Sequence, residues 1–195
     1  FVDPHSHIVF GGSRIEEIKM RLAGKTYLEI QKAGGGINFT VSATRNASEG
    51  ELLDRAEQVI SFMLKHGTTT LETKSGYGLN KEVEIKTLQI IKKLNEKYYM
   101  DIVTTFLGAH LVPKEFAHKR EEYIKLLIEE MIPSVKDLAE FCDVFCEEGA
   151  FSVEEARKIL LAGKACGLLP RIHAEQLSCI GGAELAGEIK ALSAD

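Results

Sequence analysis

Amphipathic segments with clear start and stop signals recur along the chain. Ser48 and Glu51 have the spacing of a capping box, as do Ser152 and Glu155, and Asn80 is a suitable N-cap residue. Apolar residues follow each of these signals at helical spacing, which is typical of helices packed on a core. We expect helices over 51–66, 81–97, 121–131 (ending near Pro133) and 153–166.

Short apolar segments lie between these helices. Each is too short for a typical helix, and most are rich in β-branched or aromatic residues, which favours strands. The expected strands lie in 1–10, 69–73, 102–109, 143–146, 170–174 and 191–194. Alternating strands and helices predict a parallel sheet with crossover helices, an α/β fold. Because no Pro- or Ser-rich linker interrupts the pattern, we expect one domain without an internal boundary.

Polar residues that can take part in catalysis or binding follow most of the expected strands. These residues are His5 and His7, the segment 74–77, His110, Glu147 and Glu148, His173 and Asp195. In a (β/α)8 barrel, catalytic side chains gather at the C-terminal ends of the strands. A doubly wound sheet, the alternative, would concentrate its ligand contacts at one switch point. Thr26 and Glu29 have the spacing of a capping box, so the glycines at 34–36 are expected to follow a helix rather than a strand. They therefore do not match a dinucleotide loop, and the barrel is favoured.

Three histidines make the chain a candidate metal protein. His5 and His7 are two residues apart in an expected strand, where side chains at i and i+2 point to the same face. Neutral imidazoles suit Zn²⁺ or Fe²⁺, and His173 at the end of a later strand can converge on the same ion. The alternative is that the His-x-His pair arises by chance and merely ends a strand.

Composition and charge exclude several other classes of protein. The chain has 195 residues, of which 45% are hydrophobic and 27% charged, and its formal net charge is −5. This is ordinary globular composition without a dense basic patch, so nucleic acid is not expected as a partner. No apolar run reaches the roughly 18–20 residues that span a bilayer, so a membrane is not expected either. The four cysteines contain no CxxC pair, which favours reduced thiols in the cytoplasm.

Several sequence blocks resemble one known family in the same order along the chain. They are Phe1–His7, Phe10–Arg14, Leu22–Gly24, Ala33–Ile37, Lys74–Leu79, Phe106–His110, Asp143–Glu147, His173–Leu177 and Leu192–Asp195. The first block is similar to the first-strand motif of the amidohydrolase superfamily, and the others are similar to its imidazolonepropionase family. The resemblance covers essentially the whole chain.

The resemblance implies a fold, a reaction and a location. The family hydrolyses the cyclic amide of 4-imidazolone-5-propanoate to N-formimidoyl-L-glutamate, a cytoplasmic step of histidine degradation. It uses one zinc or iron ion in a TIM (β/α)8 barrel that a small β-sandwich flanks. We therefore expect a small-molecule substrate and metal-activated water, and we leave a homodimer open as an assembly.

The resemblance implies that functional residues of the family have counterparts at matching positions of this chain. His5, His7 and His173 match metal ligands. Arg14, Tyr77, His110 and Gln176 match substrate-contacting residues, and an arginine is suited to the propanoate carboxylate. Lys74 follows the second strand, and since the family holds one metal ion, we expect it to be structural rather than a carbamylated bridge between two ions.

Other expected parts have no counterpart in the chain. The family carries a further histidine after the Ser-Ala-Asp block, a candidate proton shuttle, and an aspartate as fourth ligand on the last barrel strand. We therefore expect 1–195 to be a partial catalytic domain with about six of eight strands, without the β-sandwich or the last strands. The catalytic acid–base residue stays unknown. The alternatives are another cyclic amidohydrolase, a deaminase, or an inactive metal-binding fragment.

Overall fold

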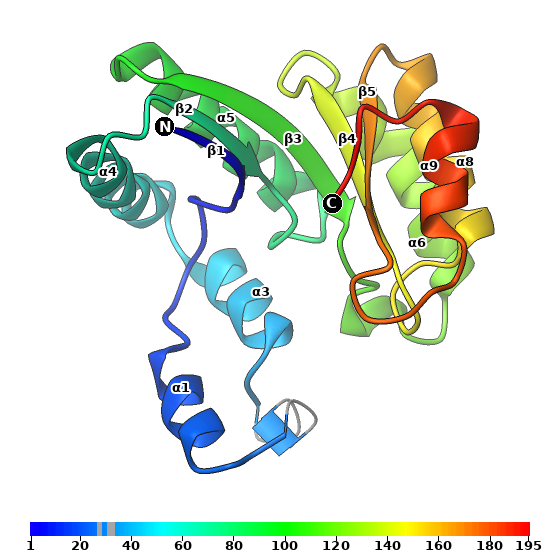
Figure 1. Ribbon diagram of the computed structural model, residues 1–195, viewed down its shortest axis with the longest axis horizontal. Helices are drawn as coiled ribbons and strands as arrows, with labels where there is room; N and C mark the ends of the chain where they lie inside the picture. Colours follow the sequence, from blue (N-terminus) through cyan, green and yellow to red (C-terminus); the bar gives the residue numbers. More distant parts are fainter. Residues whose placement is uncertain (27–28, 31–33) are drawn as a thin grey trace.

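The computed structural model describes residues 1–26, 29–30 and 34–195, and these build a curled sheet of parallel strands (Figure 1). The strands are β1 (Val2–Ser6), β2 (Thr70–Lys74), β3 (Asp101–Ala109), β4 (Phe141–Cys146), β5 (Leu169–Ala174) and β6 (Ser193–Ala194). Within the described residues the sheet has six strands, which lie in chain order, and every neighbouring pair is parallel. This order is that of a partial (β/α)8 barrel, and it confirms the α/β prediction.

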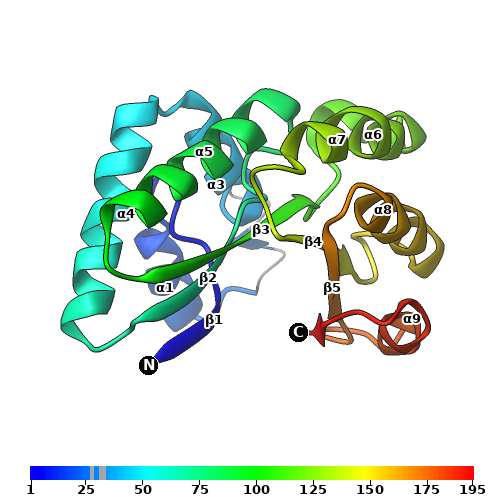
Figure 2. The same ribbon diagram turned by 90° about the horizontal axis from the view of Figure 1, so that it is seen from above.

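Helices connect the strands and cover the outer face of the sheet (Figure 2). They are α4 (Glu49–Lys65), α5 (Lys81–Lys97), α6 (Arg120–Leu126), α7 (Ile132–Val135), α8 (Val153–Ala165) and α9 (Gly182–Ile189). Two helices that the pattern did not predict, α1 (Ile15–Leu22) and α3 (Ile37–Asn46), project beyond the end of β1 (Figure 1). No helix in the described part of the chain is both long enough and apolar enough to cross a membrane.

The predicted helix starts are confirmed. The side chains of Ser48 and Ser152 each accept a hydrogen bond from the backbone N–H three residues on, and both capping boxes are complete. The Asn80 side chain accepts from the N–H of Val83 at the start of α5. Caps are local interactions, so a sequence pattern can predict them.

The helix expected over 121–131 continues past Met131 and ends at Val135, two residues after Pro133. A π-helical turn over Leu127–Met131 follows α6, and α7 then runs to Val135 with Pro133 in its first turn. Proline lacks an N–H and disrupts a helix interior, but a first turn needs no donor at that position. The π turn therefore allows the helical path to continue through the proline.

Apolar and polar residues separate onto the two faces of the sheet. The outer face packs Leu71 of β2 and Ile102 of β3 against buried residues of α4 and α5, among them Leu88. Glu72 and Lys74, which alternate with the apolar residues of β2, are buried on the inner face. The inner face of the barrel therefore holds the charged groups that build the site.

Candidate metal and substrate site

Two imidazoles meet on the inner face of the sheet. The Nε2 atoms of His5 on β1 and His173 on β5 are 3.1 Å apart, and the rings are perpendicular. Two nitrogen lone pairs at this distance repel each other unless a proton or a cation lies between them. The arrangement therefore suits a shared cation.

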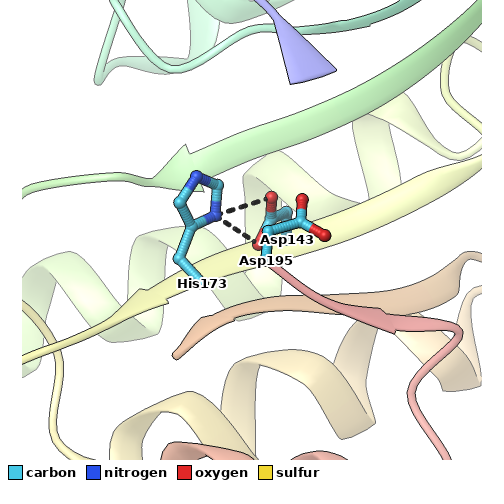
Figure 3. Close-up of side chains that lie close together, drawn as sticks. All are labelled: Asp143, His173 and Asp195. Carbon is cyan, nitrogen blue, oxygen red and sulfur yellow. Dashed lines mark hydrogen bonds and ion pairs between the residues drawn. The ribbon is translucent and has the colours of Figure 1, made fainter. Parts of the chain in front are cut away.

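The other ring nitrogen of each histidine faces a carboxylate. His173 Nδ1 lies 3.0 Å from Asp143 Oδ2, and His5 Nδ1 lies 3.1 Å from Asp195 Oδ2. Figure 3 shows His173 directed at Asp143, with Asp195 beside them. A carboxylate accepts the proton of Nδ1, which leaves Nε2 as the unprotonated nitrogen that binds a metal.

Lys74 lies behind these carboxylates and is completely buried. Its Nζ is 3.0 Å from both Glu72 Oε1 and Asp143 Oδ2, and 3.3 Å from Asp195 Oδ2. Burial alone lowers the pKa of Lys74, but the Asp143 and Glu72 carboxylates outweigh burial and raise it. Lys74 therefore stays charged and balances the acidic groups.

A second set of donors also meets the distance requirement for a metal ion. Among the described residues, Asp143, His173 and Asp195 each place one donor atom within 4.8 Å of the others. An ion bound there would lie beside the Lys74 ammonium, because that group already contacts both carboxylates. The Nε2 atoms are the ring nitrogens that do not face these carboxylates, so the imidazoles are the better-matched donors for a cation.

His7 lies just past the end of β1, because the strand stops at Ser6 and its register shifts after Asp3. The two histidines therefore do not share a regular strand, and their ring centroids are 6.2 Å apart. The buried Nδ1 of His7 has no hydrogen-bond partner among the residues that the structure describes. A buried nitrogen without a hydrogen-bond partner lowers the stability of the fold. It is therefore expected where a side chain binds a ligand or an ion.

Two aromatic residues line the wall beside His7. The His110 ring stacks on His7 with centroids 5.4 Å apart, and the Tyr77 ring centroid lies 4.8 Å from that of His7. His110 Nδ1 is 3.0 Å from the carbonyl oxygen of Gly76, which assigns the ring proton to this nitrogen. Burial lowers the pKa of His110 to about 4, so the ring is neutral at pH 7 and Nε2 can accept a hydrogen bond.

All seven residues that the sequence predicts for the site line one cavity of about 1400 Å³. They are His5, His7, Arg14, Tyr77, His110, His173 and Gln176. They come from the ends of β1, β2, β3 and β5 and from the loops that follow, which is where a barrel places its catalytic groups. The structure therefore brings together residues that are up to 171 positions apart in the sequence.

Arg14 is held at the start of α1 by an acidic neighbour. Its Nε and Nη2 atoms donate to the two carboxylate oxygens of Glu17, at 2.8 and 2.7 Å. The same carboxylate accepts the N–H of Gly36 at 2.7 Å, which links the beginnings of α1 and α3. Glu17 therefore orients the guanidinium on one wall of the cavity.

Buried acids also hold the loops that carry Tyr77 and Gln176. Glu84 accepts hydrogen bonds from the N–H groups of Gly76, Gly78 and Leu79. Glu147 accepts from the N–H of Leu177 at 2.8 Å and from the Ser178 hydroxyl. Each acid fixes the backbone on one or both sides of a predicted substrate-contacting residue.

Sequence reasoning missed the acids that support the site. Glu72, Glu84 and Asp143 were not considered, and Glu147 was left without a role. Asp143 gave one usable signal, since it is a charged residue inside the otherwise apolar strand β4. Such a residue is buried only when it is paired.

Several known proteins are similar in sequence to this chain over its whole length. An imidazolonepropionase from Geobacillus kaustophilus (strain HTA426) is 55% identical over the whole chain, which spans 46% of that relative. Those from Thermoanaerobacter pseudethanolicus (strain ATCC 33223 / 39E) and Myxococcus xanthus (strain DK1622) are both 52% identical over the whole chain, which spans 48% and 47% of them. The chain thus spans under half the length of these relatives.

A solved structure shares the fold. The 5-methylcytosine deaminase from Klebsiella pneumoniae, solved with phosphonocytosine, aligns with a TM-score of 0.67 at 12% identity, over 96% of this chain and 43% of that one. No family model matches the chain. Over its whole length the chain is thus similar in sequence to imidazolonepropionases.

Proposed function

We propose that the chain carries the metal site and the substrate site of a hydrolase that opens 4-imidazolone-5-propanoate to N-formimidoyl-L-glutamate. The single observation that supports this most strongly is that all seven predicted residues line one cavity. The relatives' name and the 50–55% identity support the choice of substrate. We further propose that the reaction takes place in the cytoplasm.

We propose one zinc or iron ion, with His5, His7 and His173 as its ligands from this chain. The donor set supports the ion, because it offers the 3.1 Å Nε2 pair and the unpartnered nitrogen of His7. When bound, such an ion supplies an activated water and polarises the amide carbonyl. Hydrolysis would join the water oxygen to the carbonyl carbon, break the ring C–N bond and transfer one proton of the water to the released nitrogen.

The remaining residues bind and orient the substrate. Arg14 faces the propanoate carboxylate, which pairs bidentately with a guanidinium. Neutral His110 accepts a hydrogen bond at Nε2, while the Tyr77 hydroxyl and the Gln176 amide hold the ring. A glutamine cannot remove a proton at neutral pH, so Gln176 is not the general base.

We also propose that residues 1–195 form part of a (β/α)8 catalytic domain, with the remaining strands and a β-sandwich outside them. The share of each relative that the chain covers, 46–48%, supports this proposal. A homodimer is the assembly that we propose for the whole enzyme.

Hydrolysis and ligand binding together test the proposed function. We expect the chain to bind one zinc ion, and we expect the full-length protein to consume 4-imidazolone-5-propanoate until a chelator stops this turnover. Loss of substrate absorbance measures turnover, and elemental analysis measures the metal. Metal and substrate binding without turnover would support the inactive metal-binding alternative. A chain that binds neither overturns the proposal.

Arg14→Lys tests the assignment of the propanoate. A lysine keeps the charge but loses the bidentate pair, so we expect affinity for N-formimidoyl-L-glutamate to fall about tenfold, since a hydrogen bond to a charged group contributes about 1.5–3 kcal/mol. Calorimetry on the zinc-loaded chain measures this affinity. Arg157→Lys, on α8 and outside the cavity, is the matched control. Equal affinities for the Arg14 variant and the unsubstituted chain would remove Arg14 from the site.

A further inference from the structure

Each of the two facing imidazoles has its own carboxylate. Asp143 Oδ1 of β4 accepts from His173 Nδ1 at 3.1 Å, and Asp195 Oδ2 faces His5 Nδ1 at 3.1 Å. The Nε2 atoms of the same two rings then meet at 3.1 Å. The result is two carboxylate–imidazole pairs whose Nε2 atoms converge on one point.

One buried cation joins the two carboxylates. Lys74 Nζ lies 3.0 Å from Asp143 Oδ2 and 3.3 Å from Asp195 Oδ2, so it bridges the carboxylates of the two pairs. A third carboxylate, Glu72, contacts the same ammonium at 3.0 Å but no imidazole. The side chains of Lys74 and Asp143 are fully buried, so water screens these contacts little.

We propose that Asp143 and Asp195 are positioning residues, locked together by Lys74, that set the tautomer and direction of His173 and His5 toward the metal ion. The inference rests on the metal site of the proposed function. In this arrangement the carboxylates hold the Nδ1 protons, and both Nε2 atoms are left to bind the ion. They are not themselves ligands, although they lie close enough to His173 to form a group of donors.

Two observations favour positioning over direct binding. Asp143 already contacts both the His173 ring and the Lys74 ammonium, so an ion on this carboxylate would have to displace one of them. An ion between Asp143 and Asp195 would also lie beside a buried positive charge, where repulsion is strong. The Nε2 side of the rings has neither obstacle.

Zinc affinity of matched charge variants tests the proposal. Asp143→Asn, Asp195→Asn and Glu72→Gln each remove one negative charge from the contacts of Lys74, but only the first two alter a partner of an imidazole. Glu72→Gln therefore measures the effect of charge alone. We expect the two aspartate variants to lose about 10–100-fold in zinc affinity, at least tenfold more than Glu72→Gln. Competition with a chelator measures the affinity of each purified chain.

Nitrogen NMR of the histidine rings shows which ring nitrogen carries the proton. A loss of stability alone would not change this second measurement. In the zinc-loaded chain we expect His173 and His5 to carry the proton on Nδ1, and we expect Asp143→Asn to shift His173 alone. Asp195→Asn should shift His5 alone, and it serves as the second variant should Asp143→Asn not fold. Equal affinity losses in all three variants, or rings protonated on Nε2, overturn the inference. A chain that binds no zinc without any substitution instead overturns the proposed function.

Discussion

His173→Ala should lower zinc affinity by more than about 100-fold, because the loss of a ligand exceeds the 10–100-fold effect of losing a ligand's hydrogen-bond partner. His173 is buried, and it faces His5 through one ring nitrogen and Asp143 through the other. Its removal deletes a donor and leaves the Asp143 carboxylate without its imidazole. Chelator competition on the purified chain measures the change.

His118→Ala is the matched control, because His118 is exposed and does not line the cavity. It should leave zinc affinity unchanged. His5→Ala separates the two sets of donors, since His5 belongs to the imidazole pair but not to the group of Asp143, His173 and Asp195. We expect His5→Ala to weaken binding as strongly as His173→Ala. Unchanged affinity in His5→Ala would place the ion on the carboxylates.

Glu84→Ala should lower the free energy of unfolding by about 3 kcal/mol or more, because a buried donor left unsatisfied costs about 1–3 kcal/mol. The Glu84 carboxylate is fully buried and accepts from the N–H groups of Gly76, Gly78 and Leu79. Without it these three donors lose their acceptor, and the loop that carries Tyr77 is released. Urea denaturation followed by circular dichroism measures the change.

Glu96→Ala is the control on the same helix, since Glu96 is an exposed residue of α5. It should change the free energy of unfolding by less than about 0.5 kcal/mol. Glu84→Gln keeps one acceptor oxygen, so its free energy of unfolding should lie between those of Glu84→Ala and Glu96→Ala. If Glu84→Ala unfolds at the same urea concentration as Glu96→Ala, the Glu84 contacts do not hold the loop.

Local signals explain which elements could be predicted. The starts of α4, α5 and α8 depend on caps within three residues of each other, and all three were predicted correctly. The continuation of the helix through Pro133 depends on a π turn, which has no comparable local signal. α1 and α3 were not predicted, because neither has a side-chain cap.

The residues of the candidate site also fall into a group that could be predicted and a group that could not. Resemblance supplied the residues that face the cavity, and their roles stay predictions. It did not supply Asp143, Glu72 or Glu84. Asp143 contacts residues of β2 and β5, and Glu84 of α5 contacts the loop before its own helix. Nothing near Asp143 in the sequence indicates that it pairs with Lys74 and His173, which are 69 and 30 positions away.

The sequence by itself determined the alternation of strands and helices, the capped helix starts and the polar residues at the strand ends. These features depend on periodicity and on contacts between near neighbours. Only the tertiary structure decided that His5 and His173 meet at 3.1 Å and that Lys74 joins their carboxylates. The physical reason is that the curled parallel sheet sets these distances, since it places strands far apart in sequence around one inner face.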